Sequence, residues 1–119
     1  MAQSLLVLIT KAPYGYEEGF AGARLALSQL AGGMITKCNV LLVGDGTLNA
    51  VASQRPEAVK MPSNGDALGD LVDFEAKVYC VKEDLHDRVG DVAVLDSVTG
   101  IDWSEARKII ADHEMVTTF

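Results

Sequence analysis

The segment LLVLITKAPYGYEEGFAGARLALSQLAGG, residues 5–33, decides the fold class because it contains a complete strand, loop and helix. Residues 5–9 form an unbroken apolar run of strand length, the pattern of a strand that helices cover on both faces. Pro13 then favours a loop, because proline restricts the backbone of the residue before it. From residue 17 to residue 30 apolar side chains recur at three- and four-residue spacing, which predicts a helix that a pair of glycines ends.

The same alternation continues along the chain. Further strands are predicted at residues 38–43, 76–81, 92–95 and 115–119, the last as an edge strand. Helices are predicted at residues 47–53, 66–74, 82–89 and 103–111, with a surface loop at 54–65. Five strands alternating with helices predict a single α/β domain, residues 1–119, with a five-stranded, mostly parallel open sheet covered by helices on both faces.

Composition narrows the functional classes. A chain of 119 residues that is 49% hydrophobic and 23% charged fits one compact globular domain. Its formal net charge of −7 argues against nucleic acid as a direct partner, because nucleic-acid affinity depends on clustered Lys and Arg. The longest apolar runs fall far short of the ~20 residues of a membrane helix, and no basic region precedes the first one. We therefore expect a cytoplasmic protein without a membrane partner.

The cysteines and histidines offer no metal-binding or disulfide pattern. Cys38 and Cys80 belong to no CxxC motif and are too few for a disulfide framework, so we expect reduced thiols. His86 and His113 have no second His or Cys three or four residues away, which favours structural or surface roles. No metal or other cofactor is predicted.

Candidate chemistry lies at the carboxyl ends of the predicted strands, where open α/β sheets gather their ligands. The segments predicted there are residues 11–16, 44–47, 80–82 and 96–100. The turn at residues 44–47 could present backbone N–H groups to an anion, but it matches no phosphate-binding motif and Asp45 would repel a phosphate. A tight turn is therefore favoured over a small-molecule binding module. Tyr14 and Tyr16 suit a pocket rim or an interface.

Cys80 is the residue whose position suggests reactivity. It ends a predicted strand and precedes a helix whose first turn can lower a thiol pKa. Lys82 would favour the thiolate, whereas Glu83 and Asp84 would oppose it. These residues leave open whether Cys80 is a buried core thiol or a reactive sulfur. Cys38 begins its strand, at the opposite edge of the sheet, which favours a buried structural thiol.

Over nearly its whole length the chain resembles the DsrE/DsrF sulfur-relay family, which includes the TusD and TusC subunits. The resemblance rests on the order and spacing of KAPYG at 11–15, VGDG at 43–46, Cys80, LHDRVG at 85–90 and the ending from ADHEMV at 111–116 to Phe119. It implies a small flavodoxin-like α/β domain that assembles into trimers or hexamers, often with paralogous subunits. It also implies that Cys80 is the counterpart of the cysteine that accepts and passes on sulfane sulfur as a persulfide.

The resemblance leads to two hypotheses. In the first, the protein is a sulfur carrier or sulfurtransferase in which the Cys80 thiolate attacks a donor persulfide and then surrenders the sulfur to an acceptor protein. In the second, it is a non-catalytic assembly subunit in which Cys80 is buried. Residues 81–84 are more acidic than is usual in the sulfur-accepting branch. The opening loop and the C-terminal ending resemble the DsrF/TusC branch, whose members are often regarded as supporting subunits.

Overall fold

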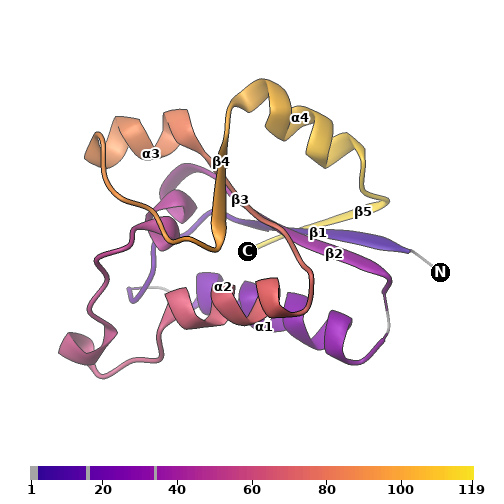
Figure 1. Ribbon diagram of the computed structural model, residues 1–119, viewed down its shortest axis with the longest axis horizontal. Coiled ribbons are helices and arrows are strands. Elements are labelled where there is room, and N and C mark those ends of the chain that lie inside the picture. The colour runs from indigo at the N-terminus through magenta and orange to yellow at the C-terminus, as the bar shows by residue number, and fades with distance from the viewer. Residues whose placement is uncertain (1–2, 16, 34) are drawn as a thin grey trace.

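The computed structural model describes residues 3–15, 17–33 and 35–119. Its centre is one sheet of five strands in the order β4-β3-β2-β1-β5 (Figure 1). The strands are β1 (Ser4–Ile9), β2 (Lys37–Leu42), β3 (Val78–Val81), β4 (Val98–Ile101) and β5 (Met115–Thr118). All the pairings between them are parallel, which confirms the predicted α/β fold with an open sheet.

The connections place helices on both faces of this sheet. The helices are α1 (Glu18–Ala31), α2 (Asn64–Asp73), α3 (Lys82–Val89) and α4 (Trp103–Ala111), with two 3₁₀ helices, η1 (Gly44–Ala50) and η2 (Pro56–Val59). From β1 to β4 the chain steps across the sheet in one direction, and from β4 to β5 it reverses. Because crossovers between parallel strands are right-handed, α1 and α2 cover one face and α4 covers the other (Figure 1). None of these helices, within the ranges described, is long and apolar enough to cross a bilayer.

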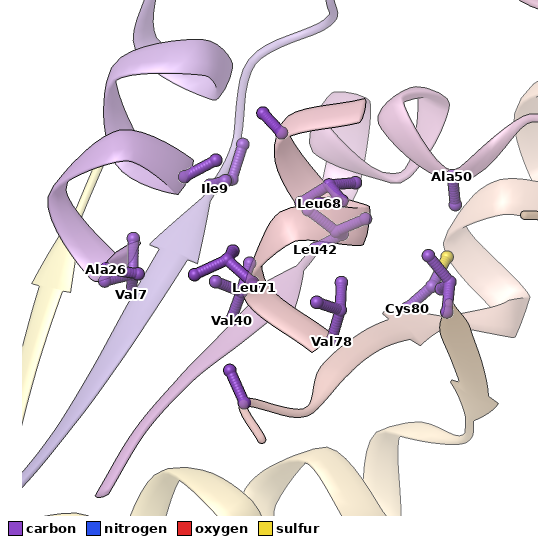
Figure 2. Close-up of a cluster of buried hydrophobic side chains, with 14 of the residues drawn as sticks. Val7, Ile9, Ala26, Val40, Leu42, Ala50, Leu68, Leu71, Val78 and Cys80 are labelled. Atoms are coloured by element: carbon purple, nitrogen blue, oxygen red, sulfur yellow. The ribbon is translucent and has the colours of Figure 1, made fainter. Parts of the chain in front are cut away.

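The alternation of side chains along each strand divides the core between the two faces. On β2, Val40 and Leu42 pack on the side of α1 and α2, whereas Leu41 packs on the side of α4. Figure 2 shows the first of these clusters, with Val7 and Val40 beside Leu71 of α2 and with Cys80 near Ala50 of η1. Cys80 therefore lies on the α1 and α2 side of the sheet, at the carboxyl end of β3.

The predicted fourth strand at residues 92–95 is wrong. Val94 forms only an isolated antiparallel bridge with Val51, and the backbone N–H of Leu95 donates to Ala50 at 2.8 Å. This segment is therefore hydrogen-bonded to the end of η1 and does not join the sheet. The fourth strand is β4, which overlaps residues 96–100, the segment predicted as its exit. Gly100 weakened the strand signal there, because glycine is unusual inside a strand.

The remaining boundaries differ less. The helix predicted at residues 47–53 is the 3₁₀ helix η1, which begins three residues earlier. The loop predicted at 54–65 contains η2 and the first residues of α2, and β3 begins two residues later than predicted. The predicted bounds of α3, which follows Cys80 directly after Val81, are confirmed.

Candidate functional site

A pocket of about 580 Å³ opens at the carboxyl ends of β3 and β4. This volume falls within the range of small-molecule sites in proteins. Its wall is formed by apolar and charged side chains of α3 and by the segment at residues 92–95, whose backbone is hydrogen-bonded to η1. The lining residues are Cys80, Lys82, Glu83, Leu85, His86, Asp87, Gly90, Asp91, Val92, Val94, Val98 and Gly100. Three exposed carboxylates and one lysine therefore surround a largely apolar interior.

Cys80 contributes a sulfur atom to this pocket from the end of β3. It pairs with Leu42 on one side and with Gly100 on the other, and α3 begins two residues later. Its side chain is only 2% exposed, and Sγ lies 3.9 Å from the carbonyl oxygen of Val81, to which the thiol donates a weak hydrogen bond. The residue thus combines a buried position with a place in the pocket wall.

The surroundings of Cys80 favour the neutral thiol. Burial raises its pKa to about 11, and the negative charge of Asp84 contributes to the same direction. In the isolated chain these effects outweigh any benefit from Lys82 or from the N-terminus of α3. At pH 7 Cys80 is then almost entirely in the neutral thiol form. A sulfur-transfer role therefore requires a way to remove the thiol proton.

Cys38 provides an internal comparison. It is 1% exposed, lies in the core near the start of β2, and is not among the residues that line the Cys80 pocket. Burial raises its pKa to about 11 as well. The two cysteines therefore differ in access to a pocket and not in their tendency to ionise.

His86 and Asp91 form a pair at the same pocket that the sequence did not indicate. His86 Nδ1 lies 3.1 Å from Asp91 Oδ1, and both residues line the pocket with Cys80. The pair forms because Gly90 has a positive φ of 69°, which turns the chain sharply at the end of α3. Neither residue belongs to a recognisable motif, so only the three-dimensional structure brings them together.

The glycine turn after β2 has no free place for an anion at its first amide. The backbone N–H of Gly44 donates to Asp84 Oδ2 at 2.8 Å, and the N–H of Gly46 donates to the carbonyl of Val43. An internal carboxylate thus occupies the place that a bound anion would take. These contacts favour the tight turn over the small-molecule binding module.

The other candidate residues have structural contacts. The Tyr14 hydroxyl donates to Gln54 and accepts from the backbone N–H of Asn64, and Tyr16 lies outside the described residues. His113 is buried against Asn39, far from His86 in the fold. In the described ranges no three His, Cys, Asp or Glu residues come together as a metal site.

Comparison with known proteins agrees with this architecture. Residues 3–110 match the model of the DsrE/DsrF-like family. The crystal structure of the YchN protein from E. coli is similar, with a TM-score of 0.87 and 21% identity over 98% of this chain and 99% of that one. A conserved protein of unknown function from Bacteroides thetaiotaomicron has a TM-score of 0.65 and 13% identity, covering 97% of this chain and 94% of its own. No curated protein sequence matches.

Proposed function

Because this chain belongs to the DsrE/DsrF-like family, whose members work in sulfur relay, we propose that it accepts sulfane sulfur on Cys80 as a persulfide and passes it on. The proposal treats residues 1–119 as a single DsrE/DsrF-like domain that works in the cytoplasm. The single observation that carries the proposal is the position of Cys80 in the wall of the 580 Å³ pocket. Cys38, equally buried, is not part of that wall.

The proposed chemistry needs only thiols. The Cys80 thiolate attacks the outer sulfur of a donor persulfide, the sulfur–sulfur bond of the donor breaks, and the donor leaves as a thiolate. Cys80 then carries the sulfur as a persulfide. In the second half, an acceptor thiolate attacks the outer sulfur of this persulfide and regenerates the Cys80 thiolate. No oxidant, metal or nucleotide enters either step.

The partners follow from this chemistry and from the surface of the domain. One protein with a cysteine persulfide supplies the sulfur and another with a free thiol receives it.

We also propose assembly with further copies or paralogous subunits into a trimer or hexamer. The edge strand β5 supports this, since its outer side is unpaired in the sheet order and Met115 and Val116 are exposed apolar residues on it.

Persulfide formation tests the proposal directly. The reduced protein is incubated with glutathione persulfide, and the peptides that contain Cys80 and Cys38 are analysed by mass spectrometry. We expect one additional sulfur atom on Cys80. Cys38→Ser is the matched control and should still gain that sulfur, whereas Cys80→Ser should not. Label on Cys38 alone, or on neither cysteine, would contradict the proposal.

The 2% exposure of Cys80 favours a second candidate, a non-catalytic assembly subunit. In that case Cys80 is a core thiol and the pocket has no role in sulfur transfer. Alkylation by iodoacetamide in the native and in the urea-unfolded protein separates the two candidates. A relay cysteine reacts in the native protein, faster than Cys38, because the pocket admits the reagent. In a non-catalytic assembly subunit, both cysteines react with iodoacetamide only after the protein is unfolded.

A further inference from the structure

The proposed chemistry requires a group that can accept the proton of the Cys80 thiol, and another residue of the same pocket can serve as that group. A thiol held neutral by burial must lose its proton before it attacks a persulfide. His86 lines the same pocket, and imidazole is the side chain best suited to proton transfer near neutral pH. The question is whether its free ring nitrogen has the correct protonation state.

When the imidazole is neutral, the hydrogen bond to Asp91 determines which ring nitrogen carries the proton. His86 Nδ1 faces Asp91 Oδ1 at 3.1 Å, and a carboxylate oxygen can only accept, so Nδ1 must donate its proton there. The neutral ring then carries no proton on Nε2, whose lone pair is available. Nε2 makes no hydrogen bond to any residue that the structure describes. This is the arrangement in which an acid orients a histidine so that its other nitrogen acts as a base.

We propose that His86, held by Asp91, is the general base that takes the proton of Cys80 during sulfur transfer. This inference rests on the proposed function, because it assigns a residue to that reaction. His86 Nε2 accepts the thiol proton, either directly or through one water molecule, as Cys80 attacks the outer sulfur of the donor persulfide. The donor's sulfur–sulfur bond breaks, and its inner sulfur leaves with the electron pair. That sulfur takes the proton from Nε2, so the net reaction converts a thiol and a persulfide into a persulfide and a thiol.

The charged groups near Cys80 oppose loss of its proton. The carboxylate of Asp84 raises the pKa of the Cys80 thiol, in addition to the larger effect of burial. The charged and titratable groups that line the pocket with His86 are Lys82, Glu83, Asp87 and Asp91, together with Cys80 itself. Asp91 is the one among them with a hydrogen bond to the imidazole within the described part of the chain.

Asp87 offers a matched control for Asp91. Both are carboxylates at the same pocket, and replacing either with asparagine removes one negative charge. Of these two carboxylates, only Asp91 forms a hydrogen bond with His86. Comparing Asp91→Asn with Asp87→Asn therefore separates the effect of that hydrogen bond from the effect of losing a negative charge. The His86 side chain is 63% exposed and that of Asp91 is fully exposed, so His86→Gln and Asp91→Asn should fold normally.

The test is the initial rate of sulfur uptake from glutathione persulfide by Cys80, measured from about pH 6 to pH 10. We expect His86→Gln to lower the rate at pH 7 by about a hundredfold, and the deficit to shrink as rising pH ionises the thiol without a base. Asp91→Asn should lower the rate by about tenfold. Asp87→Asn should keep the shape of the wild-type pH profile.

The outcomes separate this proposal from the sulfur-relay function itself. A wild-type protein that gains no sulfur on Cys80 at any pH overturns the relay, and the base with it. A wild-type protein that gains sulfur while His86→Gln has the same rate and pH profile overturns only the role of His86. Equal profiles for Asp91→Asn and Asp87→Asn would show that the hydrogen bond to Asp91 does not orient a base.

Discussion

Asp84 accepts a hydrogen bond of 2.8 Å from the backbone N–H of Gly44, which joins the first turn of α3 to the start of η1, just after β2. Its other carboxylate oxygen accepts from Trp103 Nε1 at 3.0 Å, at the start of α4. One side chain therefore connects three segments at the carboxyl edge of the sheet. Because the same carboxylate raises the pKa of Cys80, the contact that positions α3 also opposes ionisation of the thiol.

Replacing this carboxylate should lower both the pKa of the Cys80 thiol and the stability of the protein. We expect Asp84→Asn to lower the pKa of Cys80, though not below 9.0, because burial is the larger cause and remains. An amide offers one acceptor where the carboxylate offers two, so the free energy of unfolding should fall by about 1–3 kcal/mol. Thiol titration in a Cys38→Ser background and urea unfolding measure the two effects.

Asp87→Asn controls for the loss of charge on the same helix. Asp87 does not contribute to the raised pKa of Cys80, so its replacement should leave that pKa nearly unchanged. If both variants shift the Cys80 pKa equally, the effect of Asp84 is not local.

Most of the fold could be predicted because periodicity reports burial. The apolar run at residues 5–9 became β1, buried on both faces, and the three- and four-residue spacing after it became α1. The prediction failed at residues 92–95, where β-branched and apolar residues looked like a strand. Val92 and Val94 line a pocket, and the backbone N–H of Leu95 donates to Ala50 of η1. A local sequence pattern carries no information about such a partner.

The candidate site could be predicted only in part. The position of Cys80 follows from strand and helix boundaries, which the sequence indicates well. Its burial does not, because the sequence predicts a strand at residues 92–95, whereas Val92 and Val94 line the pocket together with Cys80. The pairing of His86 with Asp91 depends on the backbone turn at Gly90. The sequence shows a glycine at this position but does not indicate which side chains the turn brings together.

Two glycines should respond to alanine in opposite ways. A Cβ atom on Gly46 would lie 1.9 Å from the carbonyl oxygen of Ile9, and backbone cannot move aside cheaply. Gly46→Ala should therefore lower the free energy of unfolding by more than about 3 kcal/mol. Gly69 lies within α2 with nothing within 4 Å of its Cβ position, so Gly69→Ala should stabilise by about 0.5–1 kcal/mol. Urea unfolding of both variants checks this, and a destabilised Gly69→Ala would contradict it.

Asn39 should be costly to remove because its buried side chain joins the backbone at Lys77 to the buried side chain of His113. Its Oδ1 accepts from the backbone N–H of Lys77 at 2.9 Å, and its Nδ2 lies 3.0 Å from His113 Nε2. Asn39→Ala leaves both partners unpaired and should destabilise the protein by about 2 kcal/mol or more. Lys37→Ala is the control, since it removes only an exposed ion pair with Asp112 and should cost less than about 1 kcal/mol. Equal losses in urea unfolding would mean that the Asn39 pair is not stabilising.

The two cysteines should make stability fall at alkaline pH. Burial raises both pKa values from 9.0 to about 11, so the unfolded chain loses thiol protons at a lower pH than the folded protein does. The stabilisation is therefore complete below about pH 9 and is lost as the pH rises toward 11. Each cysteine contributes on the order of 2 kcal/mol to this change. Urea unfolding at about pH 8 and pH 10.5 measures it.

Serine variants assign the alkaline loss to individual thiols. Serine does not ionise in this range, so Cys38→Ser and Cys80→Ser should each reduce the fall in stability between the two pH values by a similar amount. All other residues are common to the three proteins, so their contribution cancels in the difference. If Cys80→Ser loses as much stability as the wild type while Cys38→Ser loses less, Cys80 ionises as readily in the folded protein as in the unfolded chain. That result would mean that the pocket admits enough water to keep Cys80 solvated, and a base would then be unnecessary for its attack on a persulfide.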